Sequence, residues 1–240
     1  MDRAPYLIWA PPYQNGSGGI RALHRLCHLL NEHDYEASVT AAGNPEWHEY
    51  YWPLSRLEPR TIVVYPEVTF GNPLGATNRV RWVLNAPGFI GGPRQYDPDE
   101  LVFTWSTDYV HVPKDRLLTV DLVERELFNQ DGAEERDADR FWIGKGANKG
   151  IPLSPVTAGM EQITYEWPAE REDLAALLKR TRTLYTYDDK SQLNWEALLC
   201  GCKVVLLPQD RRLTLAEVAL PGDCDAQLEN FIKITQEWAT

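Results

Sequence analysis

Residues 187–205 read YDDKSQLNWEALLCGCKVV, and this stretch predicts both a fold class and the position of a site. Asp188 and Glu196 are separated by seven residues, and the apolar segment around Glu196 ends at a glycine before a β-branched pair. The pattern predicts a loop after a strand, a helix over 194–200 with Glu196 in its first turn, and a strand over 203–207. Both carboxylates then lie at the carboxyl edge of a sheet, where open α/β folds bind ligands.

Strands and helices alternate along the rest of the chain. Short apolar or β-branched runs predict strands at 6–9, 37–40, 61–65, 101–105, 117–120, 141–143, 163–167 and 183–186. Apolar residues at three- and four-residue spacing predict helices at 19–33, 171–180 and 226–240, whereas 78–85 fits either element. The acidic stretch 130–140 indicates a linker, so we expect two doubly wound Rossmann-like α/β domains, residues 1–135 and 136–240, with a C-terminal helix.

The composition narrows the classes of function. The chain has 240 residues, 43% of them hydrophobic, and nine Trp, which indicates a folded protein. A net charge of −11 disfavours a nucleic-acid binder and an anionic membrane surface. No secretory signal and no run of membrane-spanning length are visible, so we expect a cytoplasmic protein in which peripheral membrane contact stays open. We expect the four cysteines to be reduced core or near-core residues: Cys27, Cys200, Cys202 and Cys224.

A glycine-rich loop with two lysines directly follows a predicted strand in the second half. It has the sequence GKGANKG over residues 144–150. Glycines let backbone amides approach a phosphate closely, and Lys145 and Lys149 would neutralise its charge. The spacing is not that of a Walker A loop, and a solvated turn is the structural alternative. Together with the acid pair downstream, the loop predicts a phosphate site.

These segments resemble the donor-binding signature of GT-B glycosyltransferases, in the group that includes glycosyltransferase family 4. That signature has two acids separated by seven residues, then Ala, a short apolar stretch, a small residue with Gly, and Val-Val. Asp188 stands where the first Glu is usual, and Lys145 and Lys149 match an Arg and Lys pair with a shorter gap. The match covers about residues 141–208, and the N-terminal half matches more loosely through the Gly18-Gly19 loop and its helix.

The resemblance implies a nucleotide-diphosphate sugar in the C-terminal domain and a hydroxyl acceptor (glycan, lipid-linked or small molecule) in the N-terminal domain, on either side of a cleft. It assigns Asp188 to the donor sugar, Glu196 to the ribose, and Lys145 and Lys149 to the diphosphate leaving group. It also implies retention of the anomeric configuration and no metal or other cofactor. The expected donor contacts are Gly144, Gly146, Tyr187, Ser191, Gln192, Leu193 and Asn194, and the acceptor or cleft candidates are Gly18, Gly19, Glu67, Asn72, Trp105 and Ser106.

Other polar and aromatic motifs favour structural roles. Asp97-Pro98-Asp99 matches a metal-binding Asp-x-Asp pattern, but a helix N-terminus with Pro at its first position explains it better. His24 and His28 are four residues apart without an evident third ligand, and neither His48 nor His111 has an obvious carboxylate partner. For Glu67 a surface salt bridge is as plausible as a cleft role. For the cluster of Trp47, Tyr50, Tyr51 and Trp52, core or interface packing is favoured over sugar stacking.

Two other functions stay open beside a glycosyltransferase. A sugar-nucleotide epimerase shares the fold class and would release free sugar or epimer without an acceptor. A non-catalytic nucleotide-sugar-binding or scaffold subunit would bind nucleotide with neither hydrolysis nor transfer.

Overall fold

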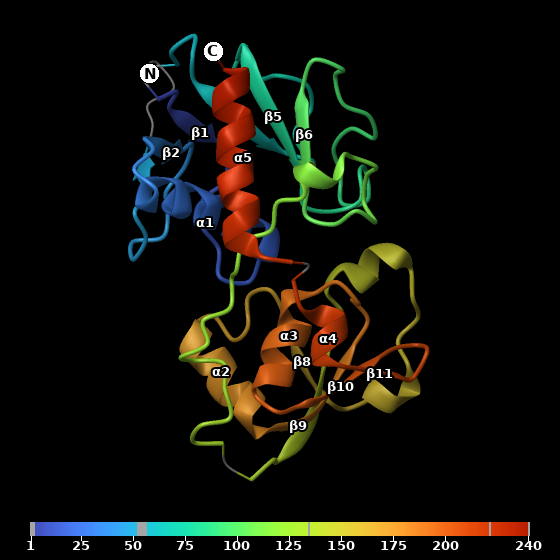
Figure 1. Ribbon diagram of the computed structural model, residues 1–240. Coiled ribbons are helices and arrows are strands. Elements are labelled where there is room, and N and C mark those ends of the chain that lie inside the picture. Colours follow the sequence, from blue (N-terminus) through green and yellow to red (C-terminus); the bar gives the residue numbers. More distant parts are fainter. Residues whose placement is uncertain (1–2, 52–56, 134, 221, 240) are drawn as a thin grey trace. The chain divides into compact units, whose positions relative to one another are not determined.

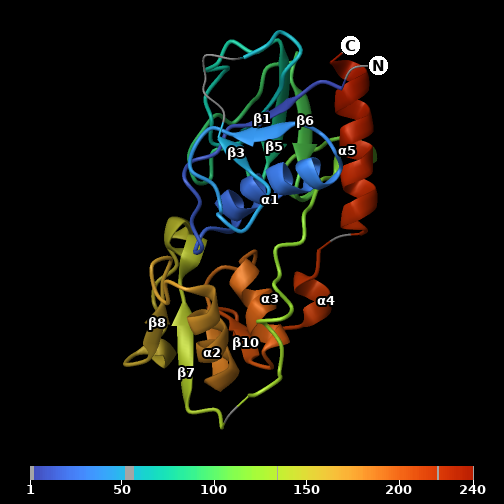
Figure 2. The same cartoon turned by 90° about the vertical axis from the view of Figure 1, so that its left-hand side faces the viewer.

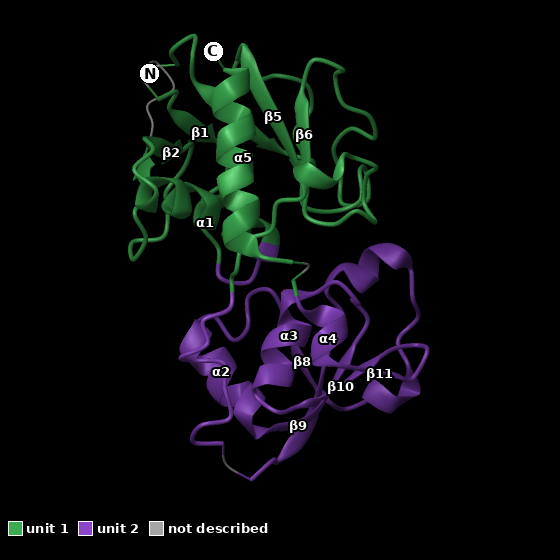
Figure 3. Cartoon of the chain, viewed as in Figure 1, with its two compact units in different colours: residues 1–14, 19–122, 220–240 green, residues 15–18, 123–219 purple. Residues whose placement is uncertain are grey.

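The computed structural model describes residues 3–51, 57–133, 135–220 and 222–239, which form two α/β units (Figure 3). Unit 1 consists of residues 1–14, 19–122 and 220–240, and unit 2 of residues 15–18 and 123–219. This division differs from the predicted boundary at 135/136. The segment from 123 packs into the second unit, and the C-terminal helix belongs to the first.

Unit 1 is built on a six-stranded parallel sheet. Its strands are β1 (Tyr6–Ile8), β2 (Ala37–Val39), β3 (Tyr50–Tyr51), β4 (Ile62–Pro66), β5 (Asn78–Val83) and β6 (Leu101–Thr104). They lie in the order β3-β2-β1-β4-β5-β6, and every neighbouring pair is parallel. This is the strand order of a Rossmann sheet, in which the winding direction reverses between β1 and β4.

Two helices cover one face of this sheet, α1 (Gly18–Glu32) and α5 (Cys224–Trp238) (Figures 1 and 2). Leu23, Leu26 and Leu30 of α1 and Phe231 of α5 pack on alternate strand residues in the larger core cluster. The other face carries a smaller cluster that includes Leu7, Val63 and Tyr65. Because both faces are buried, the central strands β1 and β4 are continuously apolar rather than alternating, whereas β5 also carries Arg79 and Arg81.

A buried arginine holds the loops on the face without these helices. Arg81 of β5 donates from Nε and Nη2 to the two carboxylate oxygens of Glu100, at 2.9 and 3.0 Å. It also donates to three carbonyl oxygens around the loop after β4, those of Pro66, Thr69 and Gly71, at 2.7–3.0 Å. These bonds satisfy backbone acceptors that a helix would otherwise pair internally.

Unit 2 has a mixed five-stranded sheet. Its strands are β7 (Ala138–Trp142), β8 (Glu161–Ile163), β9 (Thr181–Thr186), β10 (Lys203–Leu206) and β11 (Arg211–Leu213), in the order β11-β10-β9-β7-β8. Only β11 is antiparallel to its neighbour among these described strands. The helices of unit 2 in the described residues are α2 (Arg171–Arg180), α3 (Gln192–Leu199) and α4 (Leu215–Val218). The described part of the chain also has 3-10 turns, η2 (Lys114–Arg116) in unit 1 and η3 (Gly144–Lys149) and η4 (Pro155–Thr157) in unit 2.

The α/β class with Rossmann-like sheets is confirmed, but several predicted elements were wrong. Residues 117–120 form no strand beyond one bridge between Leu117 and Thr104; their apolar pattern comes from Leu118 and Val120, which fill the core of unit 1. The predicted linker 130–140 already contains the start of β7, and β8 ends at Ile163 before a turn. The ambiguous segment 78–85 is strand β5.

Candidate functional site

The loops after β7 and β9 meet at the carboxyl edge of the sheet in unit 2. β8 and β9 flank β7 on opposite sides, so the winding direction of the chain reverses at these strand ends. The N–H of Lys145, in η3, donates to Oδ2 of Asp188 at 3.1 Å. The N–H of Tyr187 donates to the carbonyl of Trp142 at 2.9 Å. The predicted phosphate loop and the first acid of the pair are therefore neighbours at the topological switch point of the unit.

Two glycines make this approach possible. Gly144 has φ of 49°, and a Cβ there would lie 2.4 Å from Nε1 of Trp142 and 2.8 Å from Oδ2 of Asp188. A Cβ on Gly146 would lie 2.5 Å from the carbonyl oxygen of Tyr187. All three distances are shorter than non-bonded atoms tolerate, so these two positions require glycine for packing between the two loops.

Asp188 is a buried acid that organises its own loop. It is 2% exposed, and besides the N–H of Lys145 its carboxylate accepts from the N–H of Lys190 at 3.3 Å. The Nζ atom of Lys145 lies 4.0 Å away. The carbonyl of Asp188 accepts from Nδ2 of Asn194 at 2.7 Å, which ties the loop to the first turn of α3.

Lys149 points to a neighbouring acid. Its Nζ donates to Oδ1 of Asp189 at 2.6 Å, and both side chains are partly exposed. Burial alone would raise the pKa of Asp189, but the bond and charge of Lys149 outweigh it and the pKa is lowered. The two predicted lysines therefore both face carboxylates of the loop after β9.

Glu196 lies deeper than the sequence indicates. Helix α3 begins at Gln192, capped by Oγ of Ser191, which accepts the N–H of Leu193 at 3.3 Å. Glu196 is therefore in the second turn, not the first. It is 2% exposed, and its two oxygens accept from Arg171, the first residue of α2, at 2.6 and 3.3 Å.

Arg171 connects three segments of unit 2, and sequence reasoning missed it. Its Nε donates to Glu124 at 2.8 Å, and its guanidinium lies 4.5 Å from the ring centre of Phe128. Burial alone would lower its pKa, but the carboxylates of Glu196 and Glu124 raise it. No local spacing links positions 124, 171 and 196, so only the folded chain reveals this ion-pair network.

Three buried polar atoms near this edge have no hydrogen-bond partner in the described part of the chain: Nε1 of Trp142, Nε2 of Gln192 and Oδ1 of Asn194. Each costs about 1–3 kcal/mol unless a ligand or water completes its bonding. The ring of Tyr165 packs edge-on against Trp142 at 4.8 Å, and burial, with Asp188 and Glu166, raises the pKa of Tyr165 to about 12.

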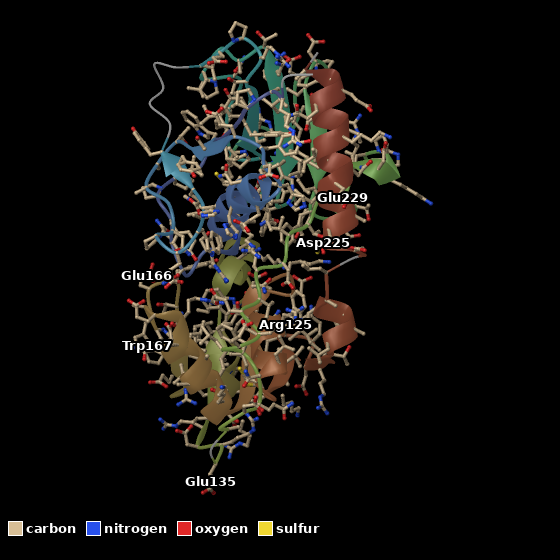
Figure 4. All side chains as sticks on the ribbon, turned by 60° about the vertical axis from the view of Figure 1, so that its left-hand side comes forward. Arg125, Glu135, Glu166, Trp167, Asp225 and Glu229 are labelled. Carbon is tan, nitrogen blue, oxygen red and sulfur yellow. The ribbon has the colours of Figure 1, made fainter. Side chains whose placement is uncertain are left out.

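The turn after β8 forms one margin of this area. Glu166 and Trp167 project from it in Figure 4. The glycine loop before α1 also contributes to unit 2: Asn15 donates to the carbonyl of Ala169 at 3.3 Å, and a Cβ on Gly16 would lie 2.1 Å from the carbonyl oxygen of Tyr165.

The two predicted glycines at the start of α1 fall in different units. Gly18 belongs to unit 2, where its Cβ position lies 3.7 Å from Cβ of Gln192. Gly19 belongs to unit 1, where its Cβ position lies 4.0 Å from Leu84. Neither contact forbids a side chain, so packing alone does not require glycine at these positions.

Glu67 and Asn72 follow β4, as predicted, but both make structural contacts. Glu67 is 2% exposed and accepts the N–H of Leu84 at 3.1 Å, which corrects the surface alternative. Oδ1 of Asn72 accepts from the hydroxyl of Tyr65 and the N–H of Ala76, both at 2.9 Å, and closes a turn.

Trp105 and Ser106 follow β6. Trp105 packs on the core beside Trp82, with ring centres 6.1 Å apart. The carbonyl of Ser106 accepts the hydroxyl of Thr104 at 2.7 Å, and its hydroxyl accepts the N–H of Asp108 at 3.2 Å. The predicted positions at strand ends are correct, and the observed bonds are those of loop residues.

The histidines of unit 1 have partners that the sequence did not reveal. His24 is fully buried between Oε2 of Glu49 at 2.6 Å and the carbonyl of Pro11 at 2.9 Å. His48 pairs with Glu32 at 2.6 Å, which corrects the expectation that it lacks a carboxylate partner. Among the described residues, no group of three His, Cys, Asp or Glu side chains could hold a metal ion.

The aromatic cluster near the edge strand β3 is split. Trp47 packs against Tyr13 and His28, with ring centres 5.4 and 5.9 Å apart. Tyr50 and Tyr51 are 60% and 67% exposed, so core packing was the wrong expectation for these two, while interface packing stays a prediction. Trp52 lies outside the described residues.

Asp97 sits in a turn rather than at a helix N-terminus, with its carboxylate accepting the N–H of Asp99 at 3.0 Å.

All four cysteines are free thiols, and Cys27, Cys200 and Cys202 are buried. Of the helices in the described ranges, none has the length and apolar character needed to cross a membrane.

Comparison with known proteins assigns no family to the chain. No family model matches it, and a search of curated proteins found no match.

Proposed function

We propose that the chain is a GT-B type glycosyltransferase that moves a sugar from a nucleotide-diphosphate sugar to a hydroxyl acceptor. The donor site is the carboxyl edge of the sheet in unit 2. One observation carries this proposal: the GKGANKG loop contacts Asp188 at the topological switch point. The N–H of Lys145 in this loop donates to the carboxylate of Asp188 at 3.1 Å. Ligands of open α/β sheets bind at such reversals of the winding direction.

The diphosphate would bind beside the backbone amides of η3 and of the N-terminus of α3, where the helix dipole favours an anion. It would take the N–H groups of Lys145 and Leu193 from their present acceptors, Asp188 and Ser191. Lys145, held 4.0 Å from Asp188, supplies a cation beside these amides. Lys149 supplies a second when it exchanges Asp189 for phosphate oxygens. Charge develops on the departing diphosphate, and fixed donors at that position lower the barrier.

The two acids take different parts in this proposal. Asp188 contacts hydroxyls of the donor sugar from the loop after β9. Glu196 binds the ribose by sharing its carboxylate with Arg171, which already holds both oxygens. Retention of configuration and independence from metals belong to the proposal through the resemblance of residues 141–208 to family 4 enzymes. A cytoplasmic location belongs to it through the cysteines, expected to be reduced, and the lack of a visible secretory signal.

Thermal shifts with UDP, GDP, dTDP, ADP and CMP, each with and without EDTA, test the donor site. A nucleotide at 100 times its Kd stabilises the folded state by about 2.7 kcal/mol, so a selective rise in Tm is expected with one diphosphate, insensitive to EDTA. Lys145→Ala should remove the shift, whereas Lys203→Ala, an exposed lysine of the same unit, should not. No shift with any nucleotide would refute the site.

A non-catalytic nucleotide-sugar-binding subunit is the second candidate. It is favoured by the ion pairs that Lys149 and Glu196 already make with Asp189 and Arg171. Incubation of the chain with the donor that the thermal shifts select distinguishes the two. Hydrolysis or transfer of the sugar supports the enzyme, and binding without either supports the subunit.

A further inference from the structure

A groove opens on unit 1 at the amino edge of its sheet, the edge opposite the carboxyl strand ends. It lies between the starts of β5 and β6 and the last turn of α5, and its volume is about 540 Å³. This volume lies within the range of small-molecule sites. The residues that matter for its chemistry are Asn78, Arg79, Asp99, Glu100, Leu101 and Trp238.

The ionic groups of the groove are mostly neutralised by each other. Arg79 donates from Nη1 to Oδ2 of Asp97 at 3.3 Å. Both oxygens of Glu100 are held by Arg81 at 2.9 and 3.0 Å. The exposed carboxylate of Asp99 is the remaining charge, because its own side chain has no bonding partner among the described residues. One carboxylate beside a matched Arg–Asp pair attracts neither a polyanion nor a metal ion strongly.

The remaining groups suit a neutral ligand that carries many hydroxyls. Asp99 offers two acceptor oxygens, and Nη2 of Arg79 makes no bond within the described residues, whereas the Nε of Arg79, also unbonded, is buried. Such planar, forked side chains can bond two adjacent hydroxyls at once. Trp238 adds a half-buried indole ring, a large surface for the apolar face of a ring-shaped ligand.

We propose that this groove binds a neutral saccharide, with Trp238 packing on a sugar ring and Asp99 and Arg79 bonding its hydroxyls. The site is separate from the donor site and does not depend on glycosyltransferase activity. It also gives Asp97-Pro98-Asp99 a role without a metal: Asp97 orients Arg79 and the turn, and Asp99 faces the ligand.

Saturation-transfer NMR and calorimetry on the whole chain, without nucleotide, test the proposal. The probes are the methyl glycosides of glucose, galactose and mannose, N-acetylglucosamine, maltose and cellobiose, with inorganic phosphate and glucose 6-phosphate for contrast. At least one neutral sugar should bind, with a Kd near about 1 mM, which corresponds to roughly 4 kcal/mol.

Variants then locate the binding. Asp99→Asn and Trp238→Ala should each weaken it at least about tenfold. Glu229→Gln, an exposed acid on the same helix α5 (Figure 4), and Trp167→Ala, an exposed indole of unit 2, should leave it unchanged. Because Asp99 is exposed, Asp99→Asn tests the site even if Trp238→Ala fails to fold.

Three results would overturn the inference. They are no saturable binding by any neutral sugar, binding confined to the two anionic probes, and binding that survives both groove variants. Failure of the nucleotide experiment leaves this one unaffected, since the sugars are tested with no nucleotide present.

Discussion

Replacing Arg171 by Met should cost unit 2 a large share of its stability. The guanidinium is 9% exposed and donates two bonds to the 2% exposed carboxylate of Glu196 and one to Glu124. Met fills much of the same space without charge, so the buried carboxylate of Glu196 loses both bonds from the guanidinium. Removing one partner of a buried pair costs about 3–5 kcal/mol.

The neighbouring substitutions should have graded effects. Glu124→Gln should cost about 0–1 kcal/mol, because Glu124 is 34% exposed and exposed ion pairs contribute little. The double variant Arg171→Met with Glu196→Met should recover most of the loss, since apolar replacement of a whole buried pair is often neutral. A coupling energy of about 2 kcal/mol or more between positions 171 and 196 is therefore expected.

Urea unfolding followed by circular dichroism and tryptophan fluorescence measures these differences. The chain has two units, so two transitions are expected and the one that shifts belongs to unit 2. A loss below about 1 kcal/mol for Arg171→Met, with no coupling to position 196, would contradict the conclusion that the pair is desolvated. Nucleotide titration of Glu196→Gln in the same buffers separates loss of stability from loss of a ribose contact.

Three further outcomes are expected. Gly146→Ala should destabilise unit 2 by about 1–3 kcal/mol in calorimetry, because its Cβ would overlap a carbonyl oxygen. Gly18→Ala, whose Cβ would make only an ordinary van der Waals contact with Gln192, should stay within about 0.5 kcal/mol. Burial, then the charge of Arg25, lowers the pKa of His28. The unfolded chain therefore binds more protons at this position, so the stability that His28 contributes above about pH 6.5 is lost as the pH falls. His28→Asn keeps an acceptor for the N–H of His48 and should flatten the dependence of the unfolding free energy on pH. An unchanged pH dependence would contradict this role of His28. Arg81→Met should cost about 3–5 kcal/mol and speed hydrogen exchange in the loop after β4, whereas normal protection there would show that the loop does not need the arginine.

The positions of most strands and helices could be predicted from local sequence pattern. Strand and helix positions follow from apolar runs and three- and four-residue spacing, and most of them agree with the structure. The meeting of Lys145 and Asp188 was also predictable, because parallel strands bring their following loops to one edge. Residues 117–120 misled this reasoning, since Leu118 and Val120 are apolar for core filling and not for strand pairing.

Local sequence pattern was enough to predict the α/β class, the glycine loop and the place of the first acid, since each depends on neighbours within a few residues. Tertiary structure decided the partners of buried charges. Glu196 is held by Arg171, His24 by Glu49 and Arg81 by Glu100, pairs separated by 25, 25 and 19 positions. Tertiary structure also places α5 in unit 1 and brings Trp238 and Asp99 to the same groove. Such contacts form because apolar faces of helices and sheets must be buried and buried charges must be paired. The partners come from distant parts of the sequence, so only the folded chain brings them together.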